Sequence, residues 1–114
     1  MIGTVRALVA DIAREVRTGD LQPARSRELL MTLTSLIGNC TVEEQEADAE
    51  YAVVLLRHLD GEEAANRAKI RAETTPEYKR KQIAHGTTRL VVEMIRTLKI
   101  CIRSISDEMQ LGSR

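Results

Sequence analysis

Residues 76–109 have the sequence PEYKRKQIAHGTTRLVVEMIRTLKICIRSISDEM, and the predicted architecture follows mainly from them. Pro76 suits the first position of a helix, and Thr75 before it suits the N-cap. Beyond Pro76 only Gly86 interrupts good helix formers, and one glycine weakens a helix by roughly 1 kcal/mol without ending it. The stretch therefore predicts one helix of ~33 residues, about 50 Å long.

Apolar residues recur along this predicted helix at spacings of three and four. The main stripe consists of Ile83, Leu90, Met94, Leu98, Cys101, Ile105 and Met109. The flanking residues are Val91, Ile95 and Ile102. Together they form a face broader than a two-stranded seam needs. A compact chain of this size would have a radius of gyration of only about 13 Å. We therefore expect the helix to protrude, to bend at His85–Gly86, or to pack against other copies.

A homo-oligomer is the arrangement that this wide stripe favours. We assign its core to Leu90, Met94, Leu98, Cys101 and Ile105. Charge is unevenly placed along the chain, although 17 basic and 17 acidic residues balance overall. Residues 1–57 carry a net charge of −3 and residues 58–114 one of +3. This separation would suit self-association of the chain.

The first 40 residues predict a pair of shorter helices. The first runs from about Val5 to Thr18–Gly19, and the second starts at Pro23. Gly38–Asn39 is typical of a helix C-terminus. The capping box of residues 41–44 then predicts a new helix as far as Leu59. Asp60–Gly61 would end that helix, and an alanine-rich helix over residues 62–72 would lead into the long one.

These elements predict an all-α fold made of helical hairpins with a long C-terminal helix and a coiled-coil-like oligomer core. The chain would form a single domain. Within it we expect an N-terminal helical pair over residues 1–40 and a long helical hairpin over residues 41–110.

Composition favours a soluble protein that stays in the cytoplasm. Hydrophobic residues make up 43% and charged residues 30% of the chain. No run approaches the ~18 apolar residues that a membrane span needs. Arg6, Asp11 and Arg14 interrupt the first apolar segment, which argues against a signal peptide. Cys40 and Cys101 are therefore expected to be reduced thiols.

Two groups of residues are candidates for metal chemistry, and neither has convincing ligand spacing. Paired acidic turns hold the metal in helical pyrophosphohydrolases, but the acidic stretch here lacks a second such pair. Its members are Glu43, Glu44, Glu46, Asp48 and Glu50. His58, His85, Cys40 and Cys101 are too widely spaced for a zinc motif. We expect a solvated helix N-terminus and isolated residues instead, with no metal, no cofactor and no catalytic site.

Basic residues provide the candidate contacts for an anion or a partner. They are Lys79, Arg80, Lys81, Arg89, Arg96, Lys99 and Arg103. The last four recur at near-helical spacing, so they could track phosphates along one face. Glu93 is placed to pair with Arg89 and Arg96, which would make the same face an ordinary solvated surface. Both readings remain open.

Four short stretches within residues 47–110 form a pattern of their own. They are Ala49-Glu-Tyr51, Leu55-Leu-Arg57, Pro76-Glu-Tyr78-Lys79 and the closing Ile102-Arg-Ser-Ile-Ser106-Asp-Glu-Met109. With this pattern, residues 47–110 resemble small helical proteins encoded by tailed bacteriophages. Such proteins often come from the early, DNA-metabolism region of phage genomes. The resemblance implies that the protein acts in the cytoplasm of a bacterial host, and it implies no catalytic residues.

We therefore expect a non-enzymatic, homo-oligomeric phage or prophage accessory protein that contacts nucleic acid or protein in phage DNA metabolism. The alternative is a counter-defence protein, which blocks a host immune factor or sequesters an anionic nucleotide signal between its subunits. A hydrolase that uses the acidic stretch is a third class. Basic residues in one exposed stripe would favour nucleic acid, whereas enclosed clefts would favour a nucleotide.

Overall fold

The chain is all-α in the computed structural model, which describes residues 2–19, 21–61 and 64–112. Its helices are α1 (Ile2–Arg17), α2 (Pro23–Asp60), α3 (Ala65–Ala72) and α4 (Pro76–Gly112). The described residues include no strand. The all-helical part of the predicted fold class is thus confirmed.

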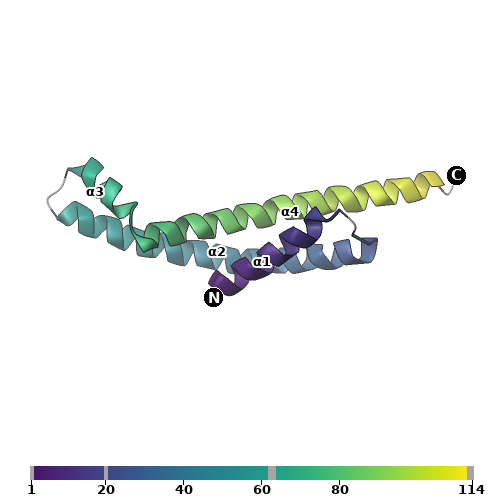
Figure 1. The fold of residues 1–114 in the computed structure, drawn as a ribbon, viewed down its shortest axis with the longest axis horizontal. Helices are drawn as coiled ribbons and strands as arrows, with labels where there is room; N and C mark the ends of the chain where they lie inside the picture. Colours follow the sequence, from purple (N-terminus) through teal and green to yellow (C-terminus); the bar gives the residue numbers. More distant parts are fainter. Residues whose placement is uncertain (1, 20, 62–63, 113–114) are drawn as a thin grey trace.

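The two long helices form an antiparallel hairpin that gives the molecule the shape of a rod (Figure 1). Its extents are 73 × 24 × 21 Å and its radius of gyration is 19.6 Å. The helix α1 crosses the middle of the hairpin and contacts both α2 and α4, while α3 packs against α2 at one end. The C-terminal part of α4 extends beyond the hairpin.

The helix α2 contradicts the prediction that a helix ends at Gly38–Asn39. It continues through both residues, and the boundary expected between residues 40 and 41 lies in its interior. The hydroxyl of Thr41 donates to the Ile37 carbonyl at 3.0 Å, so Thr41 is not an N-cap. The reason is packing. Buried residues continue at spacings of three and four on both sides of Gly38, and their burial offsets the roughly 1 kcal/mol that the glycine costs.

The helix α4 begins as predicted. The Tyr78 amide lies 3.4 Å from the Thr75 hydroxyl that accepts from it, which is the expected N-cap contact. The helix passes through Gly86 without ending. The alanine-rich helix α3 starts at Ala65, later than expected, and residues 62–63 lie outside the described residues.

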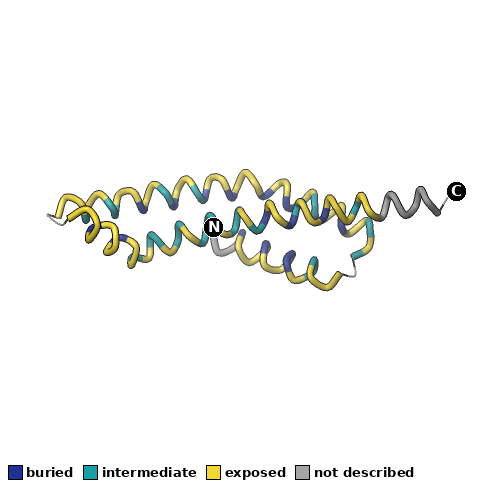
Figure 2. The backbone as a smooth tube through the Cα atoms, turned by 90° about the horizontal axis from the view of Figure 1, so that it is seen from above, coloured by how far each residue is buried: buried dark blue, intermediate teal, exposed yellow. Residues whose placement is uncertain are grey.

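The core is aliphatic and lies where α1, α2 and α4 meet (Figure 2). Its buried members are Val5, Val9, Ile12, Ala13, Leu29, Leu33, Leu36, Cys40, Val91, Met94 and Leu98. Met94 and Leu98, which we had assigned to an oligomer core, are therefore buried inside a single chain. Leu90 is partly buried against the same core, Cys101 is exposed, and the side chain of Ile105 lies outside the described residues. The contact of α1 with both long helices, which spacing within α4 cannot predict, completes this core within one chain.

Candidate interaction surfaces

The three basic residues 79–81 differ in how they contact α2. The Arg80 guanidinium pairs with Glu50, and its Nη2 lies 3.7 Å from Oε2 of Glu46. The hydrogen bond from Arg80 to Glu50 raises the pKa of the guanidinium. These ion pairs lie within the hairpin, so the Arg80 side chain links α4 to α2.

Lys81 also contacts α2. Its Nζ lies 4.7 Å from the centroid of the Tyr51 ring, and the rings of Tyr51 and Tyr78 are 5.3 Å apart. A cation over an aromatic face contributes about 0.5–1 kcal/mol at an exposed site. Lys79 is exposed and makes no ion pair with another described side chain. Arg80 and Lys81 thus contact α2 within the hairpin, whereas Lys79 is exposed.

The acidic stretch of α2 faces α4, although we expected a solvated helix N-terminus. Nε2 of His85 lies 2.8 Å from Oδ1 of Asp48, and Nδ1 lies 3.5 Å from Oε1 of Glu44. Glu43 is buried, with 7% of its surface exposed, and burial raises the pKa of its carboxyl. The opposite charges of the two halves of the chain thus meet within one hairpin.

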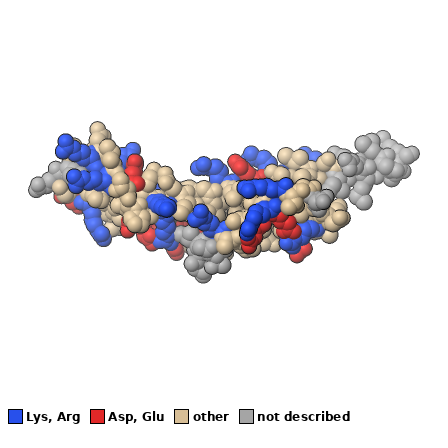
Figure 3. All heavy atoms as spheres, in the orientation of Figure 1, with Lys and Arg blue, Asp and Glu red and all other residues tan. Residues whose placement is uncertain are grey.

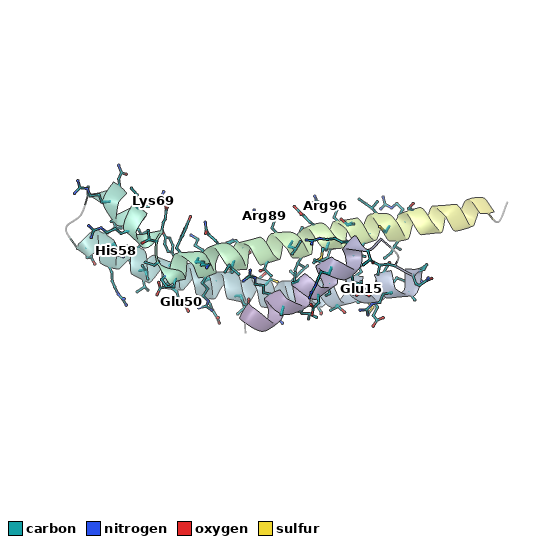
Figure 4. The ribbon with its side chains drawn as sticks, in the orientation of Figure 1. Glu15, Glu50, His58, Lys69, Arg89 and Arg96 are labelled. Atoms are coloured by element: carbon teal, nitrogen blue, oxygen red, sulfur yellow. The ribbon has the colours of Figure 1, made fainter. Side chains whose placement is uncertain are left out.

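No group of three or more histidine, cysteine, aspartate or glutamate side chains in the described residues is placed to hold a metal ion. The four residues that we weighed as a zinc site lie apart. Cys40 is buried between the long helices, where burial raises the pKa of its thiol. Cys101 is exposed. His58 lies near the C-terminal end of α2, far from His85 in the chain (Figure 4).

An exposed basic stripe runs along the outer face of α4. Arg89, Arg96 and Arg103 recur every seven residues, which spaces them by about 10.5 Å, and Lys99 lies beside them. Figure 4 shows Arg89 and Arg96 pointing away from α1 and α2. None of the four forms an ion pair with another described side chain, and the expected pairs of Glu93 with Arg89 and Arg96 are not formed. We call these four residues the basic stripe.

The hollows in the described part of the chain are shallow. One, of about 260 Å³, lies between the end of α1 and α4 and is lined by Val16, Leu21, Leu98 and Cys101 among others. Another, of about 360 Å³, follows α4 from Tyr78 to Arg89. Neither gathers the four residues of the basic stripe. Figure 3 also shows lysine and arginine side chains gathered over the α3 end of the rod.

An apolar surface that was not predicted from the sequence lies on α2, opposite the core. Its large exposed residues are Met31, Val42, Val53 and Leu56. The signal was available in the sequence. A second series at heptad spacing begins at Met31, and each of its first six members lies two residues after a buried residue. Residues two apart on a helix differ in direction by about 200°. The series, which we call the outer stripe, consists of Met31, Ser35, Gly38, Val42, Gln45, Ala49, Ala52 and Leu56.

Comparisons with known proteins do not assign the chain to a family. No protein-family model matches the chain, and neither a curated protein nor a solved structure matches it. Among the described residues, no helix combines the length and the apolar character needed to cross a membrane.

Proposed function

We propose that this chain is a non-enzymatic, homo-oligomeric accessory protein of a phage or prophage that binds nucleic acid through α4 in phage DNA metabolism. The phage assignment rests on the resemblance of residues 47–110 to small helical phage proteins. The basic stripe is the observation that supports nucleic acid as the ligand. Its arginines are regularly spaced, exposed and without ion pairs among the described side chains.

A polyanion suits this geometry better than a small nucleotide does. Arg89 and Arg103 are 14 residues apart in one helix, so about 21 Å separates them. A single nucleotide cannot reach both, whereas successive phosphates of a strand can. Nucleotide sequestration, our alternative, would need these side chains to enclose a cleft, and in one chain they lie along an open helix face.

Salt dependence of binding is the most direct test. Four phosphate contacts predict that affinity for double-stranded DNA falls about 150-fold between about 50 and about 200 mM salt. We expect fluorescence anisotropy with labelled DNA and RNA to show this dependence. Affinity that is independent of salt, or tighter binding to a mononucleotide than to a strand, would contradict the proposal.

Charge reversal locates the binding face. We expect Arg89→Glu with Arg96→Glu to weaken binding more than tenfold without changing helicity, because both side chains are exposed. The matched control is Arg6→Glu with Arg17→Glu, which makes the same change in net charge on α1. If both double variants weaken binding equally, only the overall charge matters and α4 is not the site.

A further inference from the structure

The helix α2 carries a buried series on one side and the uncharged outer stripe on the opposite side, where six of the eight residues are Met, Val, Leu, Ala or Gly. The inner series is buried against α1 and α4. The outer stripe is solvent-exposed over its whole length, and none of its eight positions carries a charge. Met31 is 75% exposed and Leu56 58%. A surface helix of a protein that acts alone would be polar on this side.

Gly38 supports the idea that another helix covers this side. It lies in the interior of α2, where glycine is less stable than alanine. A Cβ atom at this position would meet nothing within 4 Å, so the packing of this chain does not require glycine there. Glycine in the middle of an apolar stripe permits close approach of a second backbone.

The outer stripe is also complementary to itself when two copies run in opposite directions. Its positions are placed symmetrically about the midpoint between residues 43 and 44. Antiparallel pairing about this point matches large with large and small with small. The matched pairs include Met31 with Leu56, Ser35 with Ala52, and Gly38 with Ala49.

We propose that a second copy of this chain covers the outer stripe, with the two α2 helices antiparallel and related by a two-fold axis near residues 43–44. Charge supports the same register. Arg27 and Asp60 flank the two ends of the outer stripe and are symmetric about the same point, so each Arg27 meets Asp60 of the partner subunit. Both side chains are exposed, and neither has an ion-pair partner among the described residues of its own chain.

The area of the outer stripe sets the expected strength of dimer association. The outer stripe spans about 38 Å, and a strip about 10 Å wide covers about 400 Å² per chain. This is roughly half of a standard stable interface, so we expect a Kd in the micromolar range. The inference rests on the homo-oligomer part of the proposed function and identifies its interface. It does not depend on nucleic-acid binding, which would use the other long helix.

Gly38→Leu provides the sharpest test. Leucine is the better helix former, so the melting temperature should rise by about 3 °C when measured on dilute, monomeric protein. At the same time the larger side chain separates the two helices, and association should weaken at least tenfold. Gly86→Leu is the matched control, because a Cβ there also meets nothing within 4 Å. It should raise stability similarly and leave association unchanged.

The outcomes separate this inference from the proposed function. Sedimentation equilibrium should give twice 12.8 kDa for the wild type at concentrations of about 100 µM. If Gly86→Leu dissociates the protein and Gly38→Leu does not, the interface lies on α4 and the inference is wrong, although the protein is still an oligomer. If the wild type stays monomeric, both the interface and the homo-oligomer are refuted.

Two further experiments test the register. Arg27→Asp should weaken the dimer by like-charge repulsion with Asp60 of the partner subunit, and adding Asp60→Arg should restore it. In a Cys101→Ser background, chains with Gly38→Cys should form disulfides with chains carrying Ala49→Cys. Gly38→Cys should not react with itself, because about 16 Å would separate the two positions. Self-coupling of Gly38→Cys alone would indicate parallel helices and overturn the arrangement.

Discussion

Replacing Leu98 with alanine distinguishes a core within one chain from a core between chains. Leu98 is fully buried (0% exposed) against residues of the same chain. Truncation of a buried leucine to alanine typically costs about 2.7–5 kcal/mol, because it removes buried surface and leaves a cavity. With about 2.1 cal/mol/K of unfolding entropy per residue, a chain of 114 residues should lose about 11–21 °C in melting temperature.

The assay is thermal unfolding followed by circular dichroism at several protein concentrations. Ile100→Ala is the control, since Ile100 lies on the same helix and is 62% exposed; it should shift the midpoint by no more than about 2 °C. The loss in Leu98→Ala should persist in dilute, monomeric protein. If it appears only at concentrations where the protein associates, Leu98 belongs to an interface between chains and the intrachain core is wrong.

Other consequences of the structure can be checked more briefly. A thiol reagent should modify the exposed Cys101 quickly and the buried Cys40 only on unfolding, since burial also raises the pKa of the Cys40 thiol; two equally fast thiols would contradict the packing. Burial raises the pKa of Glu43, so the folded chain binds its proton more tightly than the unfolded chain, and stability is lost as pH rises from the unfolded value through the folded one. Glu43→Gln should therefore raise the melting temperature at pH 7 relative to wild type, with the gain disappearing below about pH 4; an equal gain at both pH values would rule out titration as its cause. Lys81→Ala should cost up to about 1 kcal/mol through its lost contact with Tyr51, as measured by urea unfolding. Chelator treatment should leave the melting temperature unchanged, and a fall that zinc or manganese reverses would reveal a metal site that the described residues do not form.

Local signals in the sequence predicted the helix ends that local chemistry controls. Pro23 and Pro76 begin α2 and α4, and Asp60–Gly61 ends α2. The same kind of signal was wrong at Gly38. A helix continues through a weak stop when burial on both sides outweighs the cost, and that burial depends on α4, which lies far away in the chain. Boundaries of this kind cannot be predicted without the tertiary contacts.

The candidate site was predictable to a similar degree. Regular spacing alone identified Arg89, Arg96 and Arg103 as one face of α4, and they lie on one exposed face. The contacts of Arg80 and Lys81 escaped prediction, because Glu50 and Tyr51 are about 30 residues earlier in the chain. Adjacent positions in a sequence do not share a surface when one of them turns toward a packed helix.

The two surfaces that the core leaves free lie on opposite sides of the hairpin. The inner faces of α2 and α4 are buried against each other, so the exposed basic stripe lies on the outer side of α4 and the exposed outer stripe on the outer side of α2. A dimer joined through α2 would therefore hide the apolar surface and display two basic stripes, one on each outer face. Each stripe alone offers four cations, which is few for tight binding of nucleic acid at physiological salt. Two stripes on one particle would raise the affinity for a strand that can reach both, or would bridge two separate strands. The weak association expected of α2 and the modest charge of α4 would then act together, with dimer formation setting the affinity for nucleic acid.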